Sequence, residues 1–279
     1  MIIWIASYPK SGNTWVRAII SSLLYSKDGN HDFSQLEFIE QYPVKKHFKN
    51  LLNDFYNLDE IKKNWITSQS LINADGKIRF LKTHHLYCKF GKDVFTNLAN
   101  TLGVIYIVRD PRNLLSSIKD HWSFEDFEST KNRMFDIEAS TGMYRKPDND
   151  YSFPVLISSW NNHYNYWKKL KKNYLLIKYE DLLKNTENEI LKIIRYLEKF
   201  IKFQISDQKI KNILKTTSFS YLKKMEDKGL FKESNIDNKT RELKNFFNQG
   251  PNNKWEKQIK KEIINDVEKK FYKEMKELG

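Results

Sequence analysis

The chain contains little cysteine, proline or glycine. Of its 279 residues, one is cysteine, six are proline and nine are glycine. The single cysteine, Cys88, excludes an intrachain disulfide framework and any metal cluster built from several cysteines. No internal repeat and no linker rich in proline, glycine or serine interrupts the chain, which predicts one domain over residues 1–279.

Long hydrophobic runs are also missing. No stretch approaches the roughly 18 apolar residues of a membrane-spanning helix, and a strand-like run begins at residue 2, which leaves no room for a secretory signal. We therefore expect a soluble, cytoplasmic protein that does not bind a membrane. Hydrophobic residues at 40% and aromatic residues at 14% are nevertheless enough to build a sizeable core.

Arginine is scarce although the chain is strongly basic, with a formal net charge of +13. Eight of the 48 Lys and Arg residues are arginines, so lysines make up the remaining 40. Proteins that read bases and phosphates favour the bidentate guanidinium group. The lysines are interleaved with other residues, as in 168–172 and 257–273, which favours solvated helix faces and compositional drift over a nucleic-acid surface. Attraction of a polyanionic small molecule or an acidic acceptor stays open.

The chain alternates between strand and helix patterns. Apolar runs typical of buried parallel strands occur at 2–6, 78–83, 103–108 and 174–178. Helical periodicity covers 13–25, 158–170, 187–200 and 257–278. This alternation predicts the α/β class, with three layers and a central, mostly parallel β-sheet flanked by helices.

Two regions, 26–75 and 120–153, break this alternation because they are aromatic, mixed in charge and irregular. In open α/β folds the ligand lies beyond the carboxyl ends of the strands, where such regions form walls and lids. We expect both to enclose a substrate. For any single residue in them, aromatic packing without a ligand role is an equal alternative.

The first strand leads into a helix through Tyr8-Pro9-Lys10-Ser11-Gly12-Asn13-Thr14-Trp15. Backbone N–H groups at a helix N-terminus attract anions, and a neighbouring lysine adds positive charge. The segment has one glycine and an early lysine, so it does not match the nucleoside-triphosphate loop. Taken alone, it is as readily a structural corner as an anion site.

Two further strand ends carry suitable chemistry. Arg109 ends the run at 103–108, and Ser117 follows eight residues later, so both could grip one phosphate; a local Arg109–Asp110 ion pair is the structural alternative. Lys82 lies near the end of the run at 78–83, and His84 follows it. A histidine there can accept a proton from a hydroxyl, although a lone histidine is more often a structural hydrogen-bonding group.

Together these motifs resemble the cytosolic-type sulfotransferase family, which uses 3′-phosphoadenosine-5′-phosphosulfate (PAPS). The turn from Tyr8 to Trp15 is similar to the family's 5′-phosphosulfate loop, and Lys82-Thr83-His84 is similar to its Lys-Thr-His element. The resemblance continues, in family order, through 159–167, 179–182, 217–219 and 246–255. It implies a P-loop-like sulfotransferase domain.

The resemblance also implies residue roles. His84 would deprotonate an acceptor hydroxyl, Lys10 would act at the bridging oxygen of the leaving phosphate, and Lys82 would offset charge on the sulfonyl oxygens. The family uses no metal for this transfer, and the product nucleotide is 3′,5′-ADP. The implied nucleotide-binding residues are Lys10, Ser11, Gly12, Asn13, Thr14, Trp15, Arg109, Ser117, Tyr179, Thr217, Phe219, Asn248, Gln249 and Gly250. The implied partner is a small-molecule acceptor with a hydroxyl or, less favoured, an amine.

The chain departs from the family pattern in the closing loop, where the family carries Arg-Lys-Gly and this chain reads Asn248-Gln249-Gly250. Two charges are therefore missing from the predicted 3′-phosphate site. The candidate replacements are Arg241, Lys244 and Lys254. The family's Gly-Asp-Trp-Lys stretch reads Asn253-Lys254-Trp255-Glu256.

A second departure lies beside the predicted base. Leu86 stands where the family usually has proline, and His85 is a rival to His84 as the base. A nucleotide-binding but inactive sulfotransferase-like protein is one alternative function. A kinase-like transferase and a basic nucleic-acid-binding protein are the others. No heptad seam or dimer motif is evident, and a homodimer stays open.

Overall fold

The computed structural model describes residues 1–142, 153–233, 235–236 and 243–279. The chain forms two compact units. The sheet unit comprises Met1–Pro9, Ile39–Val108 and Arg133–Leu176, and the helical unit comprises Lys10–Phe38, Arg109–Asn132 and Ile177–Gly279. We describe each by itself. The single domain over 1–279 stays a prediction.

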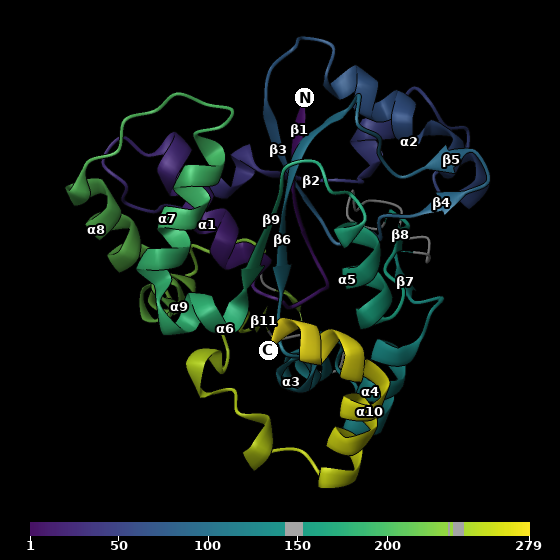
Figure 1. Ribbon diagram of the computed structural model, residues 1–279, viewed down its shortest axis with the longest axis vertical. Coiled ribbons are helices and arrows are strands. Elements are labelled where there is room, and N and C mark those ends of the chain that lie inside the picture. The colour runs from purple at the N-terminus through teal and green to yellow at the C-terminus, as the bar shows by residue number, and fades with distance from the viewer. Residues whose placement is uncertain (143–152, 234, 237–242) are drawn as a thin grey trace. The chain divides into compact units, whose positions relative to one another are not determined.

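A five-stranded sheet forms the centre of the sheet unit, in the order β2-β3-β1-β6-β9 (Figure 1). Its strands are β1 (Ile2–Ser7), β2 (Glu40–Gln41), β3 (Arg79–Thr83), β6 (Thr101–Val108) and β9 (Tyr174–Lys178). The pairs β1–β3, β1–β6 and β2–β3 are parallel. The predicted α/β class with a central, mostly parallel sheet is therefore confirmed.

Strand β1 lies between β3 and β6, and all six of its residues are buried. This position explains its continuous apolar run, since a strand covered on both faces has no polar alternation. The chain runs from β1 to β3 on one side and then returns to β6 on the other. A reversal of this kind is where α/β sheets bind ligands, beyond the strand carboxyl ends.

The described part of the sheet unit also contains two α-helices, one 3-10 helix and two antiparallel pairs of two-residue strands. These elements are η2 (Lys45–Phe48), α2 (Leu58–Ile72), β4 (Lys89–Phe90), β5 (Asp93–Val94), β7 (Ser140–Thr141), β8 (Val155–Leu156) and α5 (Trp160–Lys168). The Asn57 side chain caps α2 by accepting hydrogen bonds from the N–H groups of Asp59 and Glu60. Helix α2 packs against β5 and η2 (Figure 1).

Aromatic side chains fill the core of the sheet unit. Trp4 lies 5.4 Å from Tyr42 and 5.5 Å from Phe95 between ring centroids, and its indole N–H donates to Thr101 Oγ1 at 2.9 Å. Buried indoles are stable in such positions because the ring packs while the N–H keeps a partner. Part of the aromatic content noted in the sequence thus belongs to the core.

The helical unit consists of short helices with one described β-pair. Its elements are α1 (Asn13–Tyr25), η1 (Phe33–Phe38), α3 (Pro111–Trp122), α6 (Tyr179–Lys184), α7 (Thr186–Leu197), α8 (Asp207–Thr216), α9 (Phe219–Asp227), β10 (Asn235–Ile236), β11 (Leu243–Lys244), η3 (Gly250–Asn252), η4 (Trp255–Lys257) and α10 (Lys261–Leu278). The chain crosses between the units several times, and two of these crossings lie inside helix α4 (Phe127–Phe135) and strand β9.

The predicted helices occur, and their shifted ends have local causes. Helix α5 begins at Trp160 rather than 158 because Ser158 adopts a left-handed conformation, with φ 64°. Helix α10 begins at Lys261 rather than 257 because Trp255–Lys257 form a separate 3-10 turn. The helix predicted at 13–25 coincides with α1.

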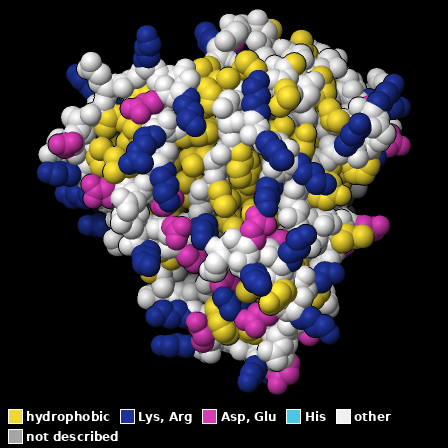
Figure 2. Space-filling view, in the orientation of Figure 1, with side chains coloured by type: hydrophobic (Ala, Val, Ile, Leu, Met, Phe, Trp, Pro, Cys, Tyr) yellow, Lys and Arg dark blue, Asp and Glu magenta, His cyan; other side chains and the backbone are white. Residues whose placement is uncertain are grey.

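Lysine and arginine are dispersed over the face shown in Figure 2, with acidic side chains among them, rather than gathered in one basic patch. This dispersal agrees with the solvated helix faces expected from the sequence. Among the helices of the described residues, none is both long enough and apolar enough to cross a bilayer.

Candidate functional site

The turn between β1 and α1 depends on two left-handed residues. Lys10 has φ 66° and Gly12 has φ 101°. A Cβ atom built on Gly12 would lie 2.6 Å from Tyr179 Cδ2, closer than carbon atoms approach. Glycine is therefore required here both for its backbone conformation and for the close approach of the Tyr179 ring.

The predicted phosphate-loop residues lie at the start of α1. Ser11, Asn13 and Thr14 are buried, and Trp15 is 9% exposed. Among the described residues, neither Ser11 Oγ nor Trp15 Nε1 has a hydrogen-bond partner. Buried polar atoms are usually satisfied, so these two atoms mark a place where a ligand would complete the structure.

Arg109 is the central cation of the helical unit. Its Nη1 donates to the Lys10 carbonyl at 3.1 Å and to Ser117 Oγ at 3.2 Å, and its guanidinium lies 4.2 Å from the centroid of the Tyr179 ring. The side chain is 6% exposed, and Nε lacks a partner among the described residues. Burial lowers the pKa of Arg109, because a charged group is less stable away from water. An anionic ligand would compensate that cost.

Ser117 accepts a second hydrogen bond, from Asn253 Nδ2 at 3.2 Å. The same amide group donates to the Asn113 carbonyl at 2.8 Å. The predicted pair Arg109 and Ser117 is therefore brought together by direct contact. Asn253 contacts Ser117 from residues 246–255, which we call the closing segment.

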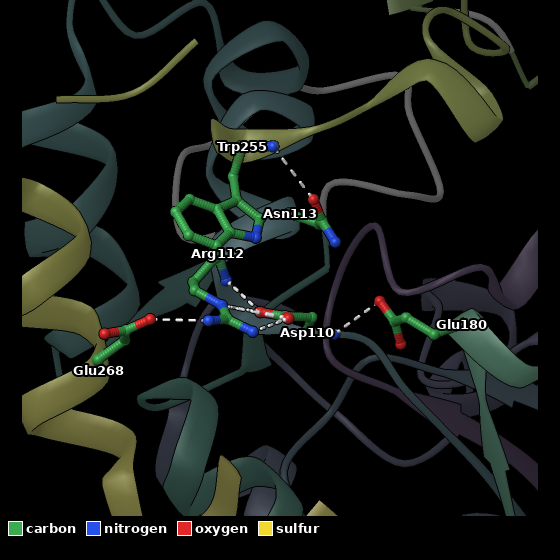
Figure 3. Close-up of polar contacts among 6 residues, drawn as sticks. All are labelled: Asp110, Arg112, Asn113, Glu180, Trp255 and Glu268. Carbon is green, nitrogen blue, oxygen red and sulfur yellow. Dashed lines mark hydrogen bonds and ion pairs between the residues drawn. The ribbon is translucent and has the colours of Figure 1, made fainter. Parts of the chain in front are cut away.

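A charged network fixes the start of α3 (Figure 3). Asp110 caps the helix by accepting from the Arg112 N–H at 2.9 Å, and its own N–H donates to Glu180 Oε1 at 3.0 Å. Arg112 forms ion pairs with Asp110 at 2.6 Å and with Glu268 of α10 at 2.7 Å, and it lies over the Trp255 ring. Asp110 therefore pairs with Arg112 rather than with Arg109, as the structural alternative had it. Arg109 instead contacts the Lys10 carbonyl and Ser117.

The aromatic residues predicted for the adenine side form two contacts. Trp15 packs edge-on against Tyr179, with centroids 5.8 Å apart. Phe219 packs on Gly250 so closely that a Cβ there would lie 2.4 Å from its ring. Thr217 is buried and donates to the Ile213 carbonyl at 2.8 Å. Its hydroxyl therefore contributes to the end of α8.

The closing segment is held by neutral amides. Asn248, where the family has arginine, donates to Asp120 Oδ2 at 2.9 Å. Gln249, where the family has lysine, accepts from Gln258 Nε2 at 2.9 Å. Both side chains are therefore engaged with protein groups rather than directed at Arg109 or Ser117.

Of the three candidate replacement cations, only Lys254 has a described side chain. Lys254 is exposed to solvent. Arg241 and the Lys244 side chain lie outside the described residues. Lys10 itself extends over Phe246 of the closing segment, with Nζ 3.8 Å from the ring centroid. This cation–π contact ties the phosphate-loop lysine to that segment.

His84 and Lys82 lie in the sheet unit, at the carboxyl end of β3. His84 Nδ1 is 2.8 Å from the Ser7 carbonyl oxygen and 3.2 Å from Ser7 Oγ. A carbonyl can only accept, so Nδ1 carries the proton and the neutral ring has its lone pair on Nε2. That tautomer can accept a proton at Nε2. Lys82 pairs in register with Ile5 of β1.

The rival histidine, His85, is fully buried. Its ring stacks on Phe95, with centroids 4.2 Å apart, and its Nδ1 lies 2.7 Å from the Leu86 carbonyl oxygen. Burial lowers the pKa of His85 to about 3. Its environment is that of a core residue.

Leu86 has a structural reason to replace proline. Its backbone N–H donates to the Leu156 carbonyl at 2.7 Å. Proline has no N–H and could not make this bond. The bond ties the residues after His84 to strand β8.

A third histidine supports the backbone at His84. His163 Nε2 lies 3.2 Å from the His84 carbonyl, and its Nδ1 lies 2.8 Å from the Tyr106 hydroxyl. Burial lowers the pKa of His163 to about 3, so the ring is neutral near pH 7. His163 lies in a segment that the sequence matched to the family without assigning it a role.

Several aromatic residues of the region 26–75 are packed in the core. Tyr42, Phe48 and Trp65 are each 0% exposed. Phe48 stacks on Phe153 at 4.8 Å, and Trp65 packs edge-on against His85 at 5.0 Å. For these residues the packing alternative holds. Residues 143–152 of the second region lie outside the described residues, and substrate enclosure stays a prediction.

Sequence reasoning did not select Ser7, Phe246 or Asn253 as site residues. Ser7 could have been found from strand register, since Ala6 pairs with Thr83 and the next residues are therefore Ser7 and His84. Phe246 and Asn253 carried no local signal of this kind, because each reaches its partner from a distant part of the sequence.

Comparisons with known proteins agree with these motifs. The model of the sulfotransferase domain family matches residues 2–279. The chain is similar to human Sulfotransferase 2A1, with 25% identity over 288 residues, which covers 98% of this chain and 84% of that protein.

The fold is similar to solved structures. Mouse sulfotransferase SULT7A1 complexed with PAP aligns with a TM-score of 0.58 and 19% identity, covering 98% of this chain and 84% of that one. Retinol dehydratase in a complex with retinol and PAP aligns with a TM-score of 0.61 and 21% identity, covering 98% and 80%. These likenesses extend the α/β assignment to the whole chain.

Proposed function

Since the chain belongs to the sulfotransferase domain family, we propose that it transfers the sulfuryl group of PAPS to a hydroxyl group of a small-molecule acceptor. An amine acceptor is the less favoured variant. In this reaction a bond forms between the acceptor oxygen and sulfur while the bond from sulfur to the bridging phosphate oxygen breaks. The products are the sulfated acceptor and 3′,5′-ADP. By its resemblance to the cytosolic-type family, we propose the cytoplasm as its location.

The helical unit would bind the nucleotide. Arg109 Nε and Ser11 Oγ have no hydrogen-bond partner within the described residues. Together with the buried Arg109 charge and the glycine at the turn, they are what an anionic group would require. In the proposal, Lys10 and the amides of residues 11–14 hold the 5′-phosphate, and Arg109 and Ser117 hold the 3′-phosphate. Trp15, Tyr179 and Phe219 pack around adenine.

The sheet unit would supply the base. His84 takes the acceptor proton at Nε2, while its Nδ1–H stays on the Ser7 carbonyl. Lys82 offsets negative charge on the sulfonyl oxygens, and Lys10 offsets the charge that develops on the leaving phosphate oxygen. Sulfuryl transfer needs positioning and electrostatic stabilisation more than covalent help, so these groups are sufficient.

The observation that carries the proposal is the Arg109 cluster, in which one buried guanidinium joins the Lys10 carbonyl, Ser117 and the Tyr179 ring. It is tested by thermal unfolding with 3′,5′-ADP, 5′-ADP or ATP. We expect 3′,5′-ADP to raise the melting temperature clearly more than the other two. Equal shifts from all three would refute the donor assignment.

The acceptor is sought with labelled PAPS and a panel of hydroxylated metabolites and amines. Transfer to a hydroxyl compound is the expected result. The retinol dehydratase structure contains retinol, which makes an apolar alcohol a reasonable first member of the panel. Binding of 3′,5′-ADP without transfer to any panel member would favour the nucleotide-binding but inactive alternative.

A further inference from the structure

The Ser117 hydroxyl has both of its acceptor positions filled by the protein. Arg109 Nη1 donates to Ser117 Oγ at 3.2 Å, and Asn253 Nδ2 donates to the same oxygen at 3.2 Å. A serine hydroxyl has two lone pairs and one O–H. With both lone pairs used, the O–H can act only as a donor. No described residue accepts it, and the Ser117 side chain is partly exposed.

Asn253 is built into this position rather than resting on the surface. It is 7% exposed, and its Nδ2 bridges the Asn113 carbonyl and Ser117 Oγ, both on α3. Its backbone N–H donates to the Gly250 carbonyl at 3.2 Å, so the side chain leaves a tight turn at a defined angle. Its Oδ1 is buried without a partner among the described residues.

We propose that Asn253 is a positioning residue for recognition of the 3′-phosphate, and this rests on the proposed function. By donating to Ser117, it turns the serine O–H toward an anionic oxygen. It thereby compensates in part for the two cations that the family has at positions 248 and 249 and that would otherwise bind the 3′-phosphate. Asn248 and Gln249 are engaged by Asp120 and Gln258, so Asn253 is the closing-segment side chain that contacts the Arg109–Ser117 pair.

The test compares the dissociation constants of 3′,5′-ADP and 5′-AMP, measured by calorimetry on the full chain. The two ligands differ only in the 3′-phosphate, so their ratio reports its recognition. Asn253→Ala should lower the preference for 3′,5′-ADP about fivefold, as expected for one neutral hydrogen bond. The affinity for 5′-AMP should be unchanged.

Asn252→Ala is the matched control, because the neighbouring Asn252 lies in the same turn and is exposed. It should leave both affinities unchanged. If Asn253 only holds the closing segment in place, Asn253→Ala should lower the affinities for 3′,5′-ADP and 5′-AMP equally. That result would overturn the proposal.

Two further variants test the route through Ser117. Asn253→Asp keeps the size of the side chain, but its carboxylate would accept a hydrogen bond from the Ser117 O–H and would repel the 3′-phosphate. The preference for 3′,5′-ADP over 5′-AMP should therefore fall about tenfold or more. In a Ser117→Ala background, Asn253→Ala should cause no further loss of preference. A full additional loss there would show that Asn253 does not act through Ser117.

Failure of this inference is distinguishable from failure of the proposed function. If the unmodified protein binds 3′,5′-ADP no more tightly than 5′-AMP, the donor assignment itself is wrong. If it prefers 3′,5′-ADP and Asn253→Ala keeps that preference, the donor assignment stands and the role of Asn253 is wrong. Thermal unfolding of each variant shows that it is folded.

Discussion

The helical unit and the sheet unit hold different kinds of ionisable group among the residues of the predicted motifs. In the helical unit, Lys10 and Arg109 are cations, and Arg109 is 6% exposed. In the sheet unit, His84 is joined by His85 and His163, and burial lowers the pKa of these last two to about 3. The cations named here include one that is buried, whereas two of the three histidines named here are kept neutral by burial.

This difference matches two different chemical tasks. A buried cation is stable only when it has an anionic or polar partner, so the helical unit is suited to hold an anion. A neutral imidazole with a fixed tautomer can accept a proton, so the sheet unit is suited to proton transfer. The comparison therefore predicts that binding and turnover can be removed separately.

Substitution of His84 should have the largest effect. We expect His84→Ala to lower turnover with PAPS by about 10²–10⁴-fold, the usual contribution of a general base. The affinity for 3′,5′-ADP, measured by calorimetry, should not change, because the nucleotide contacts are assigned to the helical unit. Unchanged turnover would move the base elsewhere, and loss of nucleotide binding would break the comparison.

Substitution of Arg109 should produce the opposite pattern. Arg109→Gln removes a charge-assisted contact, so the affinity for 3′,5′-ADP should fall by about 10- to 150-fold. The control is Arg79→Gln in the sheet unit. Arg79 pairs with Asp75 at 2.6 Å on the surface, where an ion pair contributes little. Equal losses of affinity in the two variants would show that general charge, rather than the Arg109 cluster, attracts the nucleotide.

Alanine substitution of two glycines, Gly12 and Gly76, distinguishes the effect of a steric clash on stability from the effect of backbone conformation. Gly12 has φ 101°, and an added Cβ would lie 2.6 Å from Tyr179 Cδ2; Gly76 has φ 71° and no heavy atom within 4 Å of an added Cβ. We expect Gly76→Ala to lower the free energy of unfolding by about 1 kcal/mol, from conformation alone, and Gly12→Ala by about 2–3 kcal/mol. Urea unfolding measures both, and similar losses would contradict the close packing at Gly12.

The smallest effect concerns pH and stability. His85 has a folded pKa of about 3, whereas an unfolded histidine has a pKa of about 6.5. Above pH 6.5 the ring is neutral in both states and no stability is lost. As the pH falls below 6.5, only the unfolded state gains the proton, so stability falls by about 1.4 kcal/mol per pH unit for such a group.

Urea unfolding between pH 7.5 and 5 tests this sign. His85→Phe, which keeps an aromatic ring against Phe95, should flatten the acid side of the stability profile. His163 and His31, with pKa values lowered by burial to about 3 and about 4, should still contribute to the slope. A profile with the same slope in His85→Phe would mean that His85 binds its proton equally well in the folded and unfolded states.

Much of the fold could be predicted because its signals are local. The run at β1 is apolar throughout since the strand is buried on both faces, and the helix at 13–25 begins where Gly12 permits the turn. Element ends were less accurate. The left-handed conformation of Ser158 and the separate turn at Trp255–Lys257 depend on packing that periodicity does not show.

In the candidate site, too, contacts between residues close in sequence could be predicted, whereas contacts between distant residues could not. Motif spacing brought Arg109 and Ser117 together correctly, since both lie on one strand–helix connection. It could not find Asn253, which reaches Ser117 across 136 residues of sequence. Leu86 looked like a departure from the family, and only the bond from its N–H to Leu156 explains it.

The left-handed backbone conformation of Lys10 sets stability against the presence of a lysine at this position. A lysine with φ 66° costs roughly 1–2 kcal/mol relative to an ordinary backbone conformation, and glycine would avoid most of that cost. Selection for thermal stability alone would therefore favour Lys10→Gly, whereas selection for turnover would preserve the lysine. Under the proposed function, the chain keeps a lysine at that position at the expense of stability.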